Sequence, residues 1–215
     1  MSTSILIVDD EPQVLKFCKK QLGRGGELEI HAATNALEAL RQIEEIMPRL
    51  VLLDAQLDVD GMDGIACLTE MRSKGFEGTV CILTDDSSLE LLFNAAMAGA
   101  DAFLDKSNTF GNFAWEMERL LEIPAIKRVA SLGPFDPCLG GAFLRSKGLD
   151  EFQIELLTKY TNMGFPFEKD LAYVYGISIS ALSKRFARIK NKLGIDNMSQ
   201  MVRLMTILSM YGARH

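Results

Sequence analysis

Five polar residues of this sequence, three carboxylates, a hydroxyl and a lysine, follow short apolar runs and could together carry phosphoryl chemistry. Asp9 and Asp10 come directly after the apolar residues 5–8, and Asp54 ends the run that starts at 51. Three carboxylates held close together repel one another unless a divalent cation joins them, and oxygen ligands of this kind suit Mg²⁺. Thr84 and Lys106 follow two further apolar runs. Their hydroxyl and ammonium groups could hold a phosphoryl group opposite the carboxylates.

The apolar runs that precede these residues are typical of buried parallel strands. They alternate with stretches of helical periodicity, which predicts an α/β fold with a five-stranded, doubly wound parallel sheet. Ligands bind such sheets outside the carboxyl ends of the strands, so we expect the five polar residues to meet at that edge. The expected strands are 5–8, 51–53, 80–83, 102–104 and, with a weaker pattern, 28–32; the expected helices lie near 12–22, 35–46, 63–73, 87–98 and 108–122.

Over residues 1–122 the sequence resembles the receiver domain of two-component response regulators, which has a flavodoxin-like fold. The resemblance rests on four segments, namely ILIVDDEP at 5–12, LLD at 52–54, ILT at 82–84 and GADAFLDK at 99–106. It implies that a histidine kinase transfers a phosphoryl group to the carboxylate of Asp54. It also implies that the protein modifies and dephosphorylates only itself and is not an enzyme acting on other substrates.

The resemblance further assigns roles to the residues around Asp54. Lys106 would pair with the phosphoryl oxygens, and the Thr84 hydroxyl would move toward them. Phe103 stands where receivers carry an aromatic switch residue, although a phenylalanine of the sheet core would fit the same position. The implied Mg²⁺ ligands are Asp10 directly, Asp9 through water, Asp54 and the main-chain carbonyl of Gln56.

Two features depart from the receiver pattern close to the expected site. The segment 55–64 is two residues longer than usual and lacks the customary proline, and Asp58 and Asp60 add negative charge within it. Asp85, followed by Asp86, replaces the very small residue that normally follows the conserved hydroxyl. A carboxylate at position 85 should repel an incoming phosphodonor, so we expect slow phosphorylation that Asp85→Ala would accelerate.

The distribution of charge divides the 215-residue chain into modules. Residues 1–123 hold 22 acidic and 10 basic residues, whereas residues 148–215 hold 6 acidic and 9 basic residues. The intervening segment 124–147 contains three prolines and a Gly-Gly pair, which is typical of a linker. We therefore predict a receiver domain at 1–123, a linker at 124–147 and a second domain at 148–215.

The cysteine and hydropathy patterns exclude several classes of protein. Four widely spaced cysteines and two histidines make a Cys/His zinc site improbable, and buried, reduced thiols are the simpler interpretation. No apolar run approaches the ~18 residues that a membrane span requires. The apolar residues near the start become acidic too soon for a secretory signal, so we expect a cytoplasmic protein without membrane contact.

The last 68 residues predict an all-α domain with a helix-turn-helix. Helices are expected from Asp150, which with Gln153 resembles a capping box, and over 168–175, 178–193 and about 196–211. The order of these elements resembles the LuxR-type helix-turn-helix of the NarL/FixJ response regulators. The segments that carry this resemblance are 169–172, 176–178, 188–194 and 197–202.

The helix expected at 178–193 has one apolar face and one basic face. On a helical projection Leu182, Phe186, Ile189 and Leu193 form the apolar stripe of a core-facing side. Small and basic residues on the other side could approach the major groove, where cations reach bases or phosphates. The predicted contacts to double-stranded DNA are Ser180, Lys184, Arg185, Arg188 and Lys192.

Together these patterns predict a DNA-binding response regulator that forms a homodimer when phosphorylation of Asp54 activates it. One alternative is a receiver-type regulator whose helical domain binds a protein partner instead of DNA. Another is an atypical regulator that works without phosphorylation. An enzyme that hydrolyses small phosphate esters through an aspartyl intermediate is the third. A stripe of Met201, Leu204, Met205 and Leu208 on the last expected helix suits either a core or a dimer contact.

Overall fold

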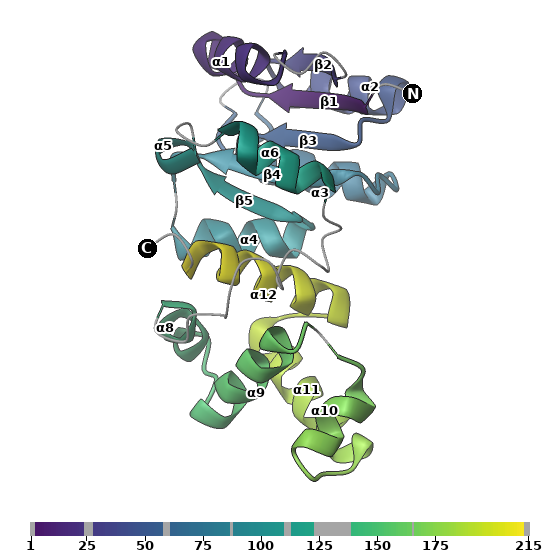
Figure 1. Ribbon diagram of the computed structural model, residues 1–215, viewed down its shortest axis with the longest axis vertical. Helices are drawn as coiled ribbons and strands as arrows, with labels where there is room; N and C mark the ends of the chain where they lie inside the picture. Colours follow the sequence, from purple (N-terminus) through teal and green to yellow (C-terminus); the bar gives the residue numbers. More distant parts are fainter. Residues whose placement is uncertain are drawn as a thin grey trace. The chain divides into compact units, whose positions relative to one another are not determined.

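The structure is a computed structural model, and it describes residues 3–23, 28–57, 61–86, 88–109, 113–122, 139–164 and 166–212 (Figure 1). Contacts between Cα atoms divide the chain into two compact units, 1–124 and 125–215. The first unit is an α/β sandwich and the second is all-helical, as the sequence predicted for the fold class. Among the described residues, no helix is both long and apolar enough to cross a bilayer.

The first unit is built on a five-stranded parallel sheet with the strand order β2-β1-β3-β4-β5. The two central strands, β1 and β3, are almost completely buried over 5–8 and 50–53, which explains their continuous apolar sequence. The strands are β1 (Thr3–Val8), β2 (Leu28–Ala33), β3 (Leu50–Leu53), β4 (Thr79–Thr84) and β5 (Ala102–Asp105).

Helices flank this sheet in two groups. α1 contacts α6, whereas α3 contacts both α2 and α4. Asn35, Asp63 and Ser88 each accept a hydrogen bond from the main chain one turn into the helix that follows, so these residues are N-caps. The helices are α1 (Pro12–Leu22), α2 (Ala36–Ile46), α3 (Gly64–Ser73), α4 (Leu89–Ala98), α5 (Lys106–Thr109) and α6 (Phe113–Glu122).

One helix expectation is confirmed over the described residues, and the linker expectation was wrong. The structure describes a helix over Phe113–Glu122 of the expected 108–122, and a short helix, α5, already starts at Lys106; residues 110–112 lie outside the described part. The segment 124–147, expected to be a linker, contains helix α8 (Leu139–Ser146). Phe143 and Leu144 of α8 are buried, and the helix packs against α9 and α12, so this part of the segment belongs to the helical unit. Residues 123–138 lie outside the described part of the chain.

The second unit contains the expected succession of a short helix, a tight turn and a longer basic helix. α10 and α11 contact each other, and Gly176 takes a left-handed conformation in the turn between them. Ser178 caps the start of α11 and Gly194 ends it in a left-handed conformation. The remaining bounds are α9 (Glu151–Asn162), α10 (Glu168–Val174), α11 (Ile179–Leu193) and α12 (Met198–Gly212).

The core of this unit is formed by the apolar faces that the periodicity predicted. Leu182, Phe186, Ile189 and Leu193 of α11 are all buried, and the Phe186 ring packs edge-on against Tyr160 of α9. The capping box of α9 is present, with Asp150 and Gln153 bonding each other's main chain. The four apolar residues of the α12 stripe, Met201, Leu204, Met205 and Leu208, are buried as well.

Candidate functional site: a carboxylate–lysine cluster at the sheet edge

The carboxyl ends of the strands bring the expected polar residues to one edge of the sheet. Asp9 directly follows β1, and Asp54 directly follows β3, whose last residue pairs with the last residue of β1. Thr84 ends β4 beside Asp105, the last residue of β5, and Lys106 comes next. The parallel register therefore places the four residues on adjacent strands at the same level.

Lys106 lies at the centre of this cluster. Its Nζ is 2.7 Å from Oδ2 of Asp54 and 2.9 Å from Oδ2 of Asp9, and it is 3.7 Å from Oε1 of Glu11. Lys106, Asp9 and Asp54 are each 5% exposed or less. Charged side chains are rarely buried to this extent unless they are paired, so the three groups hold one another in place.

Burial sets the ionisation of the cluster. Burial raises the pKa of Asp9 to about 6, even though Lys106 opposes the shift. Burial also raises the pKa of Asp54 against the same lysine. For Lys106, burial alone would lower the pKa, but the contacts with Asp54 and Asp9 outweigh it and raise the pKa. The lysine therefore stays protonated while the two carboxylates compete for its charge.

The same edge offers an acidic set of metal-ligating atoms. One carboxylate oxygen from each of Asp9, Asp10 and Asp54 lies within 4.8 Å of the others. Oδ1 of Asp9 accepts a hydrogen bond from the Glu11 main chain, and Oδ1 of Asp54 accepts one from the Gln56 main chain at 3.1 Å. Oδ2 of Asp9 is buried and has no hydrogen bond beyond its 2.9 Å ion pair with Lys106. A divalent cation would satisfy this oxygen, so the donor set fits Mg²⁺.

The loop after Asp54 is closed by a main-chain contact. The Gly64 amide donates a hydrogen bond of 2.9 Å to the Ala55 carbonyl. A Cβ atom at position 64 would overlap the Asp54 main-chain carbonyl, so only glycine fits against the strand end here. Asp58 and Asp60, which lengthen the loop, lie outside the described residues.

The two residues expected to act as a switch are both buried. Thr84 is 1% exposed and its hydroxyl oxygen accepts a hydrogen bond from the Asp86 amide at 3.3 Å. Phe103 is 5% exposed on β5. A core role and a switch role for Phe103 both agree with this burial, so the switch stays a prediction.

A pocket of about 390 Å³ opens beside Lys106. Its lining combines the lysine with two exposed acids, Glu11 and Asp85, and with the apolar side chains of Val14 and Phe17 from α1. We call Glu11 and Asp85 the acidic mouth. Sequence reasoning singled out Asp85 but overlooked Glu11, whose signal was a third consecutive acid after the first strand.

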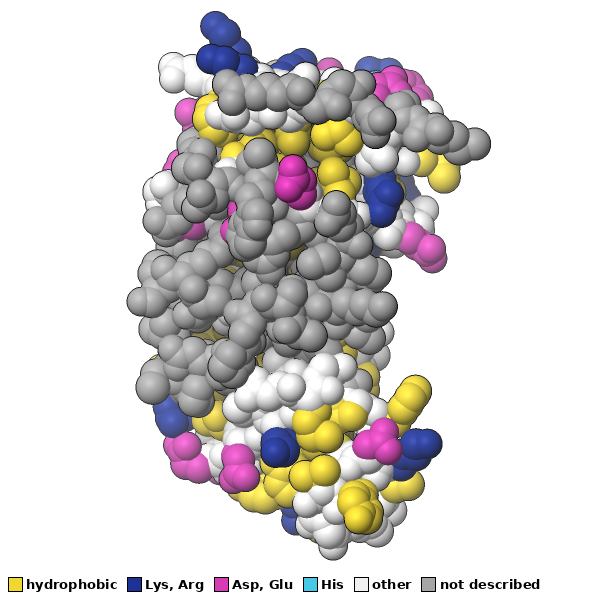
Figure 2. Space-filling model, viewed as in Figure 1, with side chains coloured by type: hydrophobic (Ala, Val, Ile, Leu, Met, Phe, Trp, Pro, Cys, Tyr) yellow, Lys and Arg dark blue, Asp and Glu magenta, His cyan; other side chains and the backbone are white. Residues whose placement is uncertain are grey.

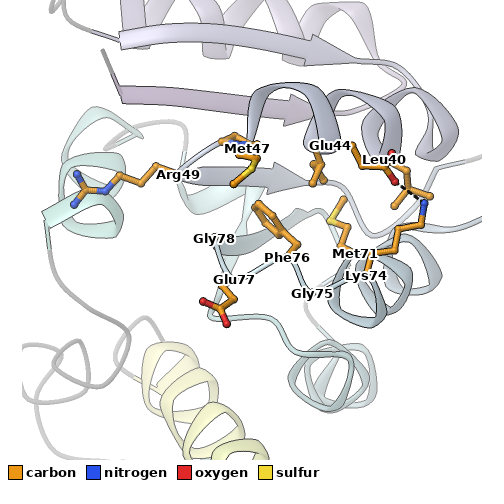
Figure 3. A pocket seen from close by; sticks show the side chains of 12 residues that line it. Leu40, Glu44, Met47, Arg49, Met71, Lys74, Gly75, Phe76, Glu77 and Gly78 are labelled. Atoms are coloured by element: carbon orange, nitrogen blue, oxygen red, sulfur yellow. Dashed lines mark hydrogen bonds and ion pairs between the residues drawn. The ribbon is translucent and has the colours of Figure 1, made fainter. Parts of the chain in front are cut away.

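A separate pocket of about 540 Å³ lies at the opposite edge of the sheet, beside the segments that enter β3 and β4 (Figure 3). Met47, Met71 and Phe76 line its apolar part. Glu44 and Lys74 form an ion pair of 2.7 Å at its border. None of the residues expected to carry phosphoryl chemistry lines this pocket, so it is separate from the cluster at the carboxyl edge of the sheet.

The described thiols are buried and chemically quiet. Cys18, Cys67 and Cys81 are free and buried. Burial raises the pKa of Cys18 and of Cys67 to about 12, so neither thiol ionises near neutral pH. Cys138 lies outside the described residues.

The predicted DNA contacts on α11 fall into two groups. Ser180, Lys184 and Arg188 are exposed. The other two are engaged by α9: the guanidinium of Arg185 lies 4.5 Å from the centre of the Phe152 ring, and Nζ of Lys192 donates a 2.7 Å hydrogen bond to Gln153. The helical projection placed Lys184 and Arg188 opposite the apolar stripe, with Arg185 and Lys192 at the edge of that face. This edge is where α9 makes its contacts.

The comparison with known families decides the identity of the first unit. The family model described as response regulator receiver domain matches residues 5–114. The chain belongs to this family. The receiver domain of NtrX from Brucella abortus superposes with a TM-score of 0.51 and is 32% identical, covering 56% of this chain and 99% of that one. A DNA-binding response regulator of the LuxR family from Staphylococcus aureus gives a TM-score of 0.51 at 26% identity, with 56% and 99% covered.

Relatives of this response regulator include proteins named as transcriptional regulators, and one of them is matched along almost its whole length. The transcriptional activator protein ExaE of Pseudomonas putida is 28% identical over 207 residues, which cover 93% of this chain and 94% of ExaE. The transcriptional regulatory protein PrrA of Mycobacterium leprae is 29% identical over 154 residues, and the match spans 69% of this chain and 65% of PrrA. The similarity to ExaE thus extends through both units of the response regulator.

Proposed function

We propose that this protein is a transcription regulator whose receiver accepts a phosphoryl group on Asp54 from a histidine kinase. The observation that carries the proposal is the position of Lys106, which bridges Asp54 and Asp9 within 2.9 Å inside a buried cluster. A weak carboxylate nucleophile needs charge neutralisation and alignment before it can attack phosphorus. The cluster supplies both, since the lysine is protonated and rigidly held.

The residues of the chain then divide the work. The Asp54 carboxylate attacks phosphorus, and Lys106 exchanges its contact with Asp54 for contacts with the new phosphoryl oxygens. The Thr84 hydroxyl, at the end of the neighbouring strand, turns toward the same oxygens and leaves space for Phe103. A bound Mg²⁺ would be held by Asp9, Asp10, Asp54 and the main-chain carbonyl of Gln56. It would supply further neutralisation of phosphate charge.

We assign DNA binding to the second unit, with the LuxR-type helix-turn-helix of the NarL/FixJ regulators as its closest pattern. The exposed Ser180, Lys184 and Arg188 of α11 would contact DNA first. Arg185 and Lys192 would lie at the edge of the contact, because both are engaged by α9. The similarity to a transcriptional activator along almost the whole chain supports this assignment. Phosphorylation would promote a homodimer that binds two half-sites.

A protein-binding role for the second unit is the alternative, and a specific surface feature favours it. Figure 2 shows hydrophobic side chains exposed among charged ones on the helical unit. Phe167 and Tyr173 of the α10 region are 77% and 88% exposed, and Ile179 at the start of α11 is 51% exposed. Large exposed apolar side chains mark a protein contact where they form one continuous patch.

The phosphorylation proposal is tested by intact mass after incubation with small phosphodonors and Mg²⁺. We expect an added phosphoryl group on the wild-type chain with at least one of acetyl phosphate and phosphoramidate, and none on Asp54→Ala. Loss of the adduct in hydroxylamine would identify it as an acyl phosphate. A wild-type chain that stays unmodified with both donors would contradict the proposal.

The DNA proposal is tested by mobility shift with genomic fragments at several salt concentrations. The double variant Lys184→Ala/Arg188→Ala should lose on the order of tenfold in affinity or more and show a shallower salt dependence, because it lacks two cationic contacts. Lys159→Ala, which removes an exposed lysine from α9, serves as the matched control. Absence of any shift at low salt, even with phosphorylated protein, would favour the protein-binding alternative.

A further inference from the structure

The pocket beside Lys106, the residue that contacts Asp54, combines acidic and apolar side chains in its lining. Its acidic mouth, Glu11 and Asp85, faces solvent beside Lys106, and its remaining wall is formed partly by Val14 and Phe17. The Phe17 ring is held by an edge-on contact with Phe113, whose centroid is 5.6 Å away. A donor that reaches Lys106 through this pocket therefore passes two carboxylates and one aromatic wall.

The electrostatic balance of this region is strongly negative. Within the described part of this edge, Lys106 is the cation that pairs with Asp9, Glu11 and Asp54, and Asp10 and Asp85 add two further carboxylates nearby. The ammonium group of Lys106 is already shared among the three paired carboxylates, at 2.7, 2.9 and 3.7 Å. Even a bound divalent cation would leave an excess of negative charge. An anionic group that enters or leaves through the mouth is therefore repelled.

The direction of the reaction makes this charge act on the leaving group. In phosphoryl transfer the attacking and leaving atoms lie roughly in line with phosphorus, so the leaving group departs on the side away from Asp54. An acyl phosphate that reached Asp54 through this pocket would release a carboxylate anion on the pocket side, which Glu11 and Asp85 line. A donor with phosphorus bonded to a protonated nitrogen releases a neutral amine or imidazole, which the two acids do not repel.

We propose that Glu11 and Asp85 make this receiver selective for donors in which phosphorus is bonded to nitrogen, and that they disfavour small acyl phosphates. The inference rests on the proposed phosphorylation of Asp54 and names the donor class of that site. Val14 and Phe17 complete the recognition, because their apolar surfaces suit the flat ring of a phosphorylated imidazole.

The atoms and electrons of the proposed step balance without a further reactant. The bond between phosphorus and the donor nitrogen breaks, and a bond forms between phosphorus and an oxygen of Asp54. The electron pair of the broken bond stays on the nitrogen. A phosphoimidazolium ring, already protonated on its second nitrogen, leaves as neutral imidazole. Phosphoramidate gives its phosphoryl group to Asp54, and its protonated nitrogen departs as ammonia, which then takes up a proton from water.

The test compares two small donors on the full-length protein at fixed Mg²⁺ and ionic strength. Acetyl phosphate is the acyl donor and phosphoramidate is the nitrogen donor, and intact mass gives the initial rate of Asp54 modification. The variants are Glu11→Gln, Asp85→Asn and the double substitution. Glu77→Gln, an exposed glutamate at the opposite edge of the sheet, is the matched control.

We expect the wild-type protein to prefer phosphoramidate. Each neutralised mouth carboxylate should raise the acetyl phosphate rate by about three- to tenfold, as expected for one like charge a few ångströms from the reacting group. The phosphoramidate rate should change little, so the ratio of the two rates should fall in the variants and stay constant in Glu77→Gln. Added salt should speed the acetyl phosphate reaction of the wild-type protein by screening the same repulsion.

A binding measurement gives a readout that does not depend on turnover. Imidazole at pH 6, added to metal-free protein, should shift the NMR signals of Val14 and Phe17 in the wild type. The shift should weaken in the double variant, because imidazolium loses its two acidic partners. Acetate should cause no such shift in either protein.

The outcomes separate this inference from the proposed function. Absence of an Asp54 adduct with both donors would contradict phosphorylation itself. Adducts that form with the same donor ratio in the wild type, the mouth variants and Glu77→Gln would overturn the selectivity while leaving phosphorylation intact. If a variant fails to fold, the salt series on the wild-type protein still decides, since a rate independent of salt refutes repulsion at the mouth.

Discussion

Arg72 joins α3 to the strands of the sheet, and its removal should strongly destabilise the receiver. Its guanidinium donates hydrogen bonds to the carbonyls of Gly99, Phe76 and Gly78 at 2.6–3.0 Å and to the Asp101 carboxylate at 2.7 Å. The Asp101 carboxylate also accepts a hydrogen bond from the Val80 amide. One arginine thus connects α3, the turn that follows it, the end of α4 and the edge of β5.

The expected loss for Arg72→Ala is about 3–5 kcal/mol of unfolding free energy. The side chains of Arg72 and Asp101 are only 16% and 12% exposed, so the substitution leaves a carboxylate and three carbonyls poorly solvated. Arg41→Ala is the matched control, because Arg41 pairs with Glu45 on the surface of α2 at the same 2.7 Å with both side chains more than half exposed. The control should cost less than about 1 kcal/mol.

Urea unfolding monitored by tryptophan fluorescence measures this difference. The sequence contains one tryptophan, Trp115, and it lies in the receiver unit, so its signal reports that unit. With a denaturant slope of about 1–3 kcal/mol/M, Arg72→Ala should lower the urea midpoint by roughly 1–5 M. Equal midpoint shifts for Arg72→Ala and Arg41→Ala would refute the reasoning, since they would mean that burial adds nothing to the ion pair.

Three further predictions concern the phosphorylation site. Gly64→Ala should destabilise the receiver by more than about 2 kcal/mol in the same urea assay, because the added Cβ would overlap the Asp54 carbonyl. Gly61→Ala is the control: position 61 has open space around it, so the substitution should cost only about 1 kcal/mol, which comes from its positive φ. The apparent Mg²⁺ affinity, measured by calorimetry, should fall about tenfold from pH 7 to pH 5. The reason is that burial raises the pKa of Asp9 to about 6, so at pH 5 its carboxylate binds a proton in place of the metal. An unchanged affinity would exclude Asp9 as a ligand. Lys106→Ala should destabilise the metal-free protein by about 3–5 kcal/mol, because Asp9 and Asp54 then repel each other without a cation between them. In thermal unfolding, added Mg²⁺ should restore part of this stability. A loss that Mg²⁺ leaves unchanged would argue against a cation among these carboxylates.

The strand positions and the carboxyl-edge residues were predictable because both follow from local patterns. Apolar runs such as 50–53 are buried on both faces of a parallel sheet, and a residue that directly follows such a run must lie at the strand end. Asp54 and Lys106 could therefore be assigned to one edge without knowledge of their distance. Asp63 and Ser178 were also readable as helix starts, since their side chains cap the main chain only a few residues away.

The features that escaped prediction depend on contacts between distant segments. Helix α8 follows a segment rich in proline and glycine, and only its packing against α9 and α12 shows that it belongs to the helical unit. The helical projection put Arg185 and Lys192 at the edge of the basic face, but it could not show that α9 contacts both. The contact of Glu11 with Lys106 joins residues that are 95 positions apart in the sequence, so no local pattern could reveal it.

The hydrogen bond between Ala55 and Gly64 has a consequence for how this receiver tolerates change. It fixes both ends of the segment between them, so residues can be gained or lost there while the carboxylate of Asp54 keeps its place beside Lys106. The length of the segment can therefore vary while the hydrogen bond between Ala55 and Gly64 holds its two ends together. Natural lengthening, or an engineered reporter peptide, placed after Gln56 would leave Asp54 beside Lys106, whereas a change in length at Gln56 itself would remove its main-chain contact with the Asp54 carboxylate.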